Sequence, residues 1–321
     1  MGRCLLLLLF LFALTVSVIQ AQTPRSAEDY LHRGNRRLIK GDLDGAIADF
    51  DSVIESDPHA ASNDTDARST DLKEVAVNRG RSLALIPNTA AAYYDRGLAR
   101  QARRDTDGAI ADFSMAIEIA PNFAESYFTR GTERYLKGGV EEAIADFNQA
   151  IALYPDYALA YVNRGNARKA KGEIDAAFAD YNRAIHFDPG LAMAYNNRGI
   201  IQFGREDYGQ ALADYNTAIK LAPRLAEAYN NRGAARQVNR DFDQAIADYN
   251  KALAINPNFY AAYENRGLAR LVQGQFAEAD KDFARYLASG REMNPELKQL
   301  IRAAKSERAR LNGGANAGGR E

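Results

Sequence analysis

The chain has 321 residues, with 41 Lys and Arg against 42 Asp and Glu, and a formal net charge of −1. A balance so close to neutrality argues against a strong nucleic-acid or anionic-membrane footprint. The three histidines, His32, His59 and His186, lie at unrelated positions, no Cys/His/Asp/Glu set has metal-ligand spacing, and no glycine-rich phosphate loop is present. We therefore predict no catalytic, cofactor-binding or metal-binding residues, and a protein that is not an enzyme.

Residues 1–21 have the features of a cleavable secretory signal peptide. Arg3 precedes an apolar run from Leu5 to Val18, and Ala21 provides a small residue before Gln22. The run is short for a membrane span of about 20 residues, so we expect cleavage and export to the periplasm or outside the cell. Retention as a membrane anchor is the alternative. Cys4 precedes the apolar run, which is the wrong place for lipid attachment, and its removal leaves a mature chain without cysteine.

A unit of 34 residues then recurs along the chain. Each unit has a tyrosine four residues before a glycine, an arginine directly before it, an alanine twelve after it, and Phe or Tyr sixteen after it. Proline closes most units at twenty-four after the glycine. The glycines are Gly34, Gly97, Gly131, Gly165, Gly199, Gly233 and Gly267, and the last six are spaced by 34 residues.

The spacing inside a unit predicts a helical hairpin. Helical periodicity around the glycine is followed by a polar break such as 239–241, and a second apolar helix ends before the proline. Facing residues of an antiparallel pair have a nearly constant sum of numbers, so we expect Gly165 opposite Ala177 and Tyr161 opposite Tyr181. Small side chains would then meet at a close crossing, where any larger side chain overpacks.

This 34-residue pattern resembles the tetratricopeptide repeat. The resemblance implies an all-α, right-handed solenoid (superhelix) of stacked helix-turn-helix repeats with a C-terminal capping helix. The expected parts are a signal peptide (1–21), a first repeat with an N-terminal lead (22–58), a degenerate repeat or linker (59–89), six consecutive repeats (90–290), and a capping helix with a disordered tail (291–321).

The degenerate segment has an uncertain register. Pro58 and Pro87 are separated by 29 residues instead of 34, and residues 71–87 suggest a second helix whose first helix is eroded. Residues 78–80 could instead mark a truncated first helix. Asp64-Thr65-Asp66 begins like a calcium loop, but Arg68 occupies a ligand position and the required glycine is missing. We expect a solvated linker there.

An arginine and an aspartate recur together, the arginine before the glycine and the aspartate sixteen residues later. The family usually has an apolar residue before the glycine, so this chain departs from the pattern. The pairs could be ion pairs inside the hairpins or a basic ladder for an anionic ligand. They are Arg33/Asp49, Arg96/Asp112, Arg130/Asp146, Arg164/Asp180, Arg198/Asp214, Arg232/Asp248 and Arg266/Asp282.

In the family, first helices line a concave groove, and here asparagines recur two residues before the glycine. An amide is both donor and acceptor, so a row of amides can pair with the backbone of an extended peptide. The alternative is that these asparagines solvate the helix edge. The predicted peptide-binding residues are Asn163, Asn197, Asn231, Asn265, Asn196 and Asn230, with Tyr135 and Phe203 as apolar pockets. Basic residues for a carboxylate clamp are missing.

These features predict an exported scaffold that binds a partner protein or an unstructured peptide segment in the groove. Its partner and oligomeric state stay open. One alternative is an assembly component of an envelope or export complex that docks by its convex face or C-terminal helix, where Leu297, Leu300 and Ile301 give an apolar side. Another is an accessory subunit of an envelope enzyme.

Overall fold

The computed structural model describes residues 26–56 and 88–293, together with 295, 296, 298, 299, 301–303 and 306. The predicted signal peptide, the glycine-rich tail and the degenerate segment lie outside these residues, except that Asn88 and Thr89 begin a helix. Within them the structure consists of helices and turns without a strand. No helix found there is both long enough and apolar enough to cross a membrane.

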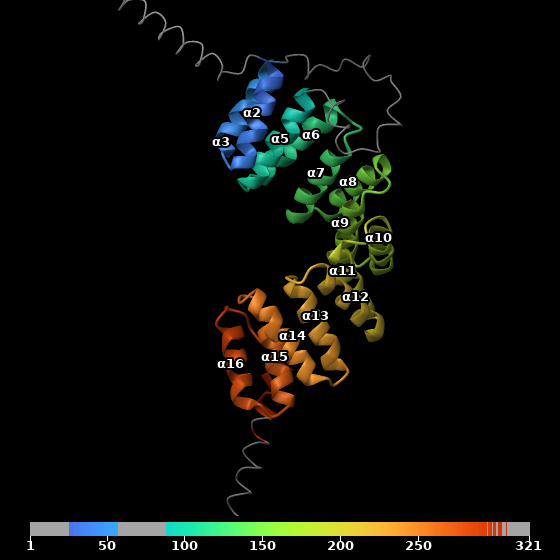
Figure 1. The fold of residues 1–321 in the computed structure, drawn as a ribbon, viewed down its shortest axis with the longest axis vertical. Helices are drawn as coiled ribbons and strands as arrows, with labels where there is room; N and C mark the ends of the chain where they lie inside the picture. The colour runs from blue at the N-terminus through green and yellow to red at the C-terminus, as the bar shows by residue number, and fades with distance from the viewer. Residues whose placement is uncertain are drawn as a thin grey trace, which may run out of the picture. The chain divides into compact units, whose positions relative to one another are not determined.

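The chain divides into two compact units, residues 1–173 and 174–321, and Figure 1 shows their helices. Unit 1 contains α2 (Ala27–Lys40), α3 (Leu43–Ser56), α5 (Asn88–Ala102), α6 (Thr106–Ile119), α7 (Ala124–Leu136), α8 (Val140–Leu153) and α9 (Ala158–Ala170). Unit 2 contains α10 (Ile174–Phe187), α11 (Ala192–Gly204), α12 (Tyr208–Leu221), α13 (Ala226–Val238), α14 (Phe242–Ile255), α15 (Tyr260–Val272) and α16 (Phe276–Leu287).

Consecutive helices pair as the predicted hairpins. We call the first helix of each repeat, which carries the glycine, the A helix, and the second the B helix. Within one repeat the A and B helices pack together, as in α2·α3, α5·α6, α7·α8, α11·α12, α13·α14 and α15·α16. The fourth repeat divides between the units, with its A helix, α9, in unit 1 and its B helix, α10, in unit 2.

Neighbouring repeats stack because each B helix packs against the next A helix, as α6 does on α7 and α12 on α13. The linker in these cases is four residues, for example 120–123. α3 packs against α5 in the same way, although residues 57–87 separate them in the sequence. The first and second described repeats are therefore direct neighbours in the stack of unit 1.

The repeat glycine faces the aromatic residue sixteen positions later, not the alanine twelve positions later as the sequence predicted. A Cβ added at Gly199 would lie 2.7 Å from Cε1 of Tyr215, and the same contact recurs between Gly34 and Phe50 at 2.5 Å. The B helix is thus displaced by about one turn from the expected register. Glycine is required because a buried ring lies directly on the A-helix backbone, so a large group meets the smallest residue.

The turn between A and B helices needs a left-handed residue seven positions after the repeat glycine. Gly41, Gly138, Gly172 and Gly274 supply it with φ values of 75° to 96°. The other described turns place Arg104, Glu206 and Arg240 there, with φ of 64°, 63° and 62°. A side chain in this conformation costs free energy that glycine avoids.

Replacing Glu206 with glycine is expected to stabilise unit 2 by about 0.5–1 kcal/mol, because the relieved strain exceeds the extra entropy that glycine has in the unfolded chain. Chemical denaturation with the slope held constant measures the gain. Gly274→Ala is the matched converse and should destabilise the same unit, because φ at this position is +75°. A steric clash would not be the cause, since the added Cβ would meet nothing closer than 3.8 Å. Equal stability of all three proteins would contradict the strain argument.

The C-terminal segment covers the last hairpin. Met293 is 6% exposed and belongs to a core cluster with Leu271 and Phe283, and Ile301 packs against the same cluster. Residues 295, 296, 298, 299, 301–303 and 306 are helical. This agrees with the predicted capping helix, whose remaining residues lie outside the described part of the chain.

Candidate functional site

The recurring arginine and aspartate form bidentate ion pairs within the hairpins. Arg198 Nε and Nη2 donate to Asp214 at 2.8 and 2.7 Å, and Asp214 is 5% exposed. The hydrogen bond with Asp214 raises the pKa of Arg198, although burial opposes this. The same pairing is present at Arg33/Asp49, Arg96/Asp112, Arg130/Asp146, Arg232/Asp248 and Arg266/Asp282. Arg164 and Asp180 lie in different units.

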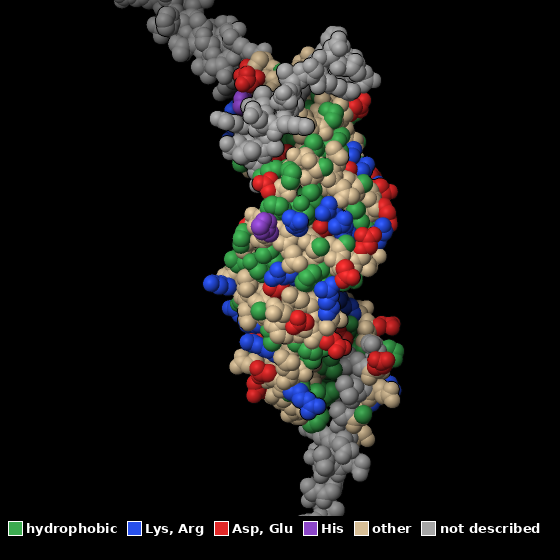
Figure 2. Space-filling model, turned by 90° about the vertical axis from the view of Figure 1, so that its right-hand side faces the viewer, with side chains coloured by type: hydrophobic (Ala, Val, Ile, Leu, Met, Phe, Trp, Pro, Cys, Tyr) green, Lys and Arg blue, Asp and Glu red, His purple; other side chains and the backbone are tan. Residues whose placement is uncertain are grey.

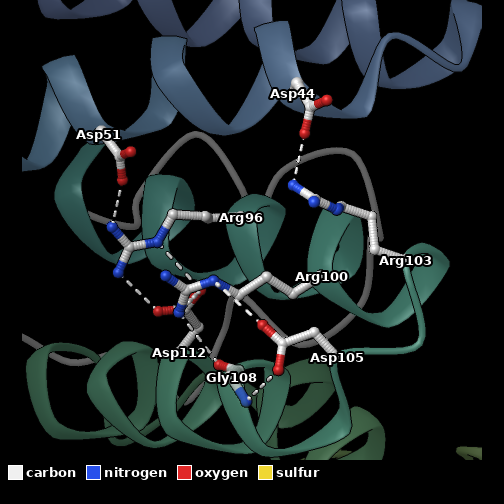
Figure 3. A network of polar contacts seen from close by, with 8 residues as sticks. All are labelled: Asp44, Asp51, Arg96, Arg100, Arg103, Asp105, Gly108 and Asp112. Atoms are coloured by element: carbon white, nitrogen blue, oxygen red, sulfur yellow. Dashed lines mark hydrogen bonds and ion pairs between the residues drawn. The ribbon is translucent and has the colours of Figure 1, made fainter.

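From the second repeat on, each of these arginines also bonds to the preceding repeat. Arg198 Nη1 donates to Asn182 Oδ1 at 2.8 Å on α10, and Arg96 reaches Asp51 on α3 (Figure 3). A second arginine, three residues after the glycine, binds the same aspartate in most described repeats, as Arg100 binds Asp112 at 2.9 Å. The guanidinium of Arg198 lies over the ring of Tyr195, 5.5 Å from its centroid. One guanidinium therefore joins three helices.

These contacts favour the ion-pair interpretation of the arginines over the anionic-ligand ladder. Figure 3 shows that Arg96, Arg100 and Arg103 of α5 each point toward a carboxylate. A cavity of about 460 Å³ beside them is lined by Arg100, Arg103, Arg104, Asp105 and Ile47. Four arginines there (Arg96, Arg100, Arg103 and Arg104) are matched by four aspartates (Asp44, Asp51, Asp105 and Asp112), so no excess positive charge remains for an anion.

Within each unit, the A helices present a stripe of mostly exposed or half-buried residues at positions six and two before, and one and five after, the repeat glycine. At 100° per residue these positions fall within about 60° of one another. A helices of neighbouring repeats also contact one another, as in α11·α13 and α13·α15. The stripe exposes apolar side chains at its two ends: Ile39, Leu136, Leu159, Met193, Val238 and Val272 are between 39% and 86% exposed.

The predicted asparagines of unit 2 are joined to one another. Asn231 Nδ2 donates to Asn196 Oδ1 at 3.0 Å, and Asn265 Nδ2 donates to Asn230 Oδ1 at 3.0 Å. Within one helix, Asn196 Nδ2 donates to Asn197 Oδ1 and Asn230 Nδ2 to Asn231 Oδ1, at 3.2 and 3.3 Å. The amides form one chain across α11, α13 and α15, because the positions two and three before the glycine meet where neighbouring A helices touch.

This network changes what the asparagines can offer a ligand. Asn196, Asn197 and Asn230 are buried, whereas Asn231 and Asn265 are half-buried in the middle of the stripe. Each amide has two N–H groups, and the contacts above use one N–H of Asn231 and one of Asn265. In unit 1, Asn163 Nδ2 donates to Thr132 Oγ1 at 3.1 Å. A role for these residues in peptide binding stays a prediction.

The two predicted apolar pockets are half-buried side chains that also serve the core. Tyr135 on α7 packs against the cluster of Ala143, Phe147 and Ala167. Phe203 on α11 makes an edge contact with Tyr208 at 5.3 Å between ring centroids. The exposed apolar residues of the stripe were not named from the sequence, yet they were recognisable by their fixed offsets of six before and five after the glycine.

Asp95 occupies the asparagine position of the second repeat. It lies half-buried on α5 and bonds to Asn35 on α2. Burial raises the pKa of its carboxyl group from 3.8 to about 6, and the bond to Asn35 only partly offsets this. A carboxyl group whose pKa is raised by folding stabilises the folded state most at pH values below its pKa in the unfolded chain. This contribution of Asp95 to the free energy of unfolding is lost as the pH rises through about 6.

Asp95→Asn is expected to stabilise unit 1 at pH 7.5 and to have little effect at pH 4, where the wild-type carboxyl is protonated. The difference is at most about 3 kcal/mol, since each pKa unit corresponds to about 1.4 kcal/mol. Urea denaturation of both proteins between pH 4 and 8 measures it. A constant difference across this range would show that Asp95 does not titrate with a raised pKa.

Stacked two-helix repeats joined by short turns define an α-solenoid scaffold. Residues 192–225, 226–259 and 248–281 match tetratricopeptide repeat models, and residues 131–172 and 165–205 match a TPR repeat model. Residues 131–281 therefore consist of tetratricopeptide repeats, and this confirms the resemblance and the fold class predicted from the sequence. No curated protein sequence was found to match it.

Solved structures share the fold at low sequence identity. A tetratricopeptide repeat protein from Parabacteroides merdae is 19% identical over 88% of this chain and 100% of its own, with a TM-score of 0.61. Cut9 in the APC/C hetero-tetramer Cut9–Hcn1 is 19% identical over 87% and 56%, with a TM-score of 0.61. Pseudomonas aeruginosa pilF is 16% identical over 71% and 100%, with a TM-score of 0.59.

Proposed function

We propose that this protein is an exported, non-catalytic scaffold that binds a partner protein or an extended peptide segment along the stripe of its A helices. Tetratricopeptide repeat proteins bind proteins or peptides and are generally non-catalytic. Export rests on the signal features of residues 1–21, and the intact mass of the protein from a periplasmic fraction tests it. A mature chain that retains these residues would contradict cleavage.

The observation that carries the proposal is the placement of exposed apolar side chains. Of the nine large hydrophobic side chains that are exposed among the described residues, six lie on the A-helix stripe. They flank half-buried amides that retain hydrogen-bonding capacity. An extended chain could bury its alternate side chains against the apolar positions, while its backbone pairs with Asn231 and Asn265.

The test compares apolar residues of the two helix layers. Met193, Val238 and Val272 on A helices are 45%, 47% and 59% exposed, and Leu221 and Leu287 on B helices are 41% and 47% exposed. Changing the first three to serine is expected to abolish capture of the native partner in a pull-down from the envelope fraction. The leucine-to-serine control should retain capture, because its substitutions lie off the stripe.

Both variants should melt close to wild type, since the changed side chains are already in contact with water. If only the B-helix control loses capture, the interface lies on the B helices, and the assembly-component alternative is favoured. Asn231→Ala and Asn265→Ala are less decisive. Each also breaks an inter-helix hydrogen bond, worth about 0.5–1.5 kcal/mol of stability, so their melting must be measured alongside binding.

A further inference from the structure

Acidic side chains accompany the apolar stripe, and basic ones are missing from it. Over the seven described A helices, the stripe positions hold four carboxylates, Glu28, Asp95, Glu125 and Glu227, and no lysine or arginine. The whole chain, by contrast, has nearly equal numbers of acids and bases. Figure 2 shows blue and red side chains interspersed over the face in view.

The A helices of unit 2 carry two carboxylates, and neither forms an ion pair with a described residue. Glu227 is exposed on α13, six residues before its glycine, and Glu264 is half-buried on α15, three residues before its glycine. On the B helices, by contrast, some carboxylates are paired, as Asp248 is with Arg232 and Asp175 with Arg205.

In unit 2, Glu227 occupies a stripe position together with the exposed Met193, Val238 and Val272, and Glu264 lies about 40° outside the edge of the stripe. These apolar and acidic groups define the chemistry of the occupant. We infer that the stripe of unit 2 takes an extended peptide segment in which lysine or arginine residues alternate with apolar residues. The apolar side chains would contact Met193, Val238 and Val272, and the cations would pair with Glu227 and Glu264. This inference rests on the proposed function and adds the charge of the partner.

Three synthetic peptides of equal length test it, with valine and serine at fixed positions and lysine, glutamine or glutamate at the same alternate positions. Fluorescence anisotropy measures their dissociation constants. The lysine peptide is expected to bind more tightly than the glutamine peptide, by about 2–5-fold for each carboxylate it meets, and the glutamate peptide most weakly. Added salt should reduce these differences.

The double variant Glu227→Gln/Glu264→Gln should bind the lysine and glutamine peptides equally, and its affinity for the glutamine peptide should match wild type. Glu278→Gln is the control, because it removes the same charge from an exposed position on the B helix α16. It should leave all three affinities unchanged, apart from a small general effect of net charge.

Equal binding of the lysine and glutamate peptides would overturn the inference, although the stripe could still be a peptide site. Failure of the lysine peptide to bind at about 1 mM would also overturn it. The proposed function is judged separately, by whether the Met193, Val238 and Val272 variant loses the native partner. Failure of the inference can therefore be distinguished from failure of the proposed function.

Discussion

Replacing Arg198 with leucine is expected to destabilise unit 2 by about 3 kcal/mol, at the lower end of the range for breaking a buried ion pair. The reason is that Asp214, 5% exposed, would keep its charge without a counterion. Among the described residues, Arg198 is the one arginine that forms an ion pair with Asp214, because Gln202 occupies the position where most repeats have a second arginine. In the fifth repeat, the ion pair between Arg198 and Asp214 can therefore be measured without a contribution from a second arginine.

A double-mutant cycle with Arg198→Leu and Asp214→Leu measures the coupling. We expect it to exceed about 1 kcal/mol, the upper limit for exposed pairs, because the Arg198 side chain is 21% and that of Asp214 7% exposed. Arg205/Asp175 is the control pair in the same unit, with side chains 41% and 97% exposed. Additive effects at Arg198 and Asp214 would favour the interpretation that the arginines form a basic ladder for an anionic ligand. Sulfate or phosphate binding would then be measured directly.

Gly199→Leu is expected to cost about 3 kcal/mol, because even its Cβ would enter the ring of Tyr215 at 2.7 Å. Tyr215 is 1% exposed and has no space to move away. Thermal or urea unfolding measures the loss. The backbone of α11 has to shift away from α12 to admit any side chain at this position.

Gly204→Leu provides the control in the same helix, since a Cβ there meets nothing within 4 Å. It should be neutral or slightly stabilising, as leucine has the higher helix propensity. Placing Gly199→Leu in a Tyr215→Ala background identifies the colliding group. If the cost of leucine is the same with and without the ring, the contact between Gly199 and Tyr215 is not its cause.

The sequence by itself determined the repeat, the hairpin and the proximity of each arginine to its aspartate, and the structure decided that they form ion pairs rather than a ladder for an anionic ligand. Gly199, Arg198 and Asp214 recur at a fixed period, and recurrence at fixed offsets is a local property that needs no knowledge of packing. Helix periodicity and turn residues also act within one hairpin. For the same reason, the proximity of Arg198 to Asp214 followed from the antiparallel geometry of a single repeat.

Tertiary structure decided which groups meet between helices. The displacement of about one turn, which places Gly199 on Tyr215 rather than near Ala211, comes from how a ring packs against a helix backbone. The bond from Arg198 to Asn182 and the amide chain through Asn196 and Asn231 join different repeats. Their geometry depends on the stacking angle between hairpins, which is set by the summed packing of many side chains and not by any spacing within one repeat.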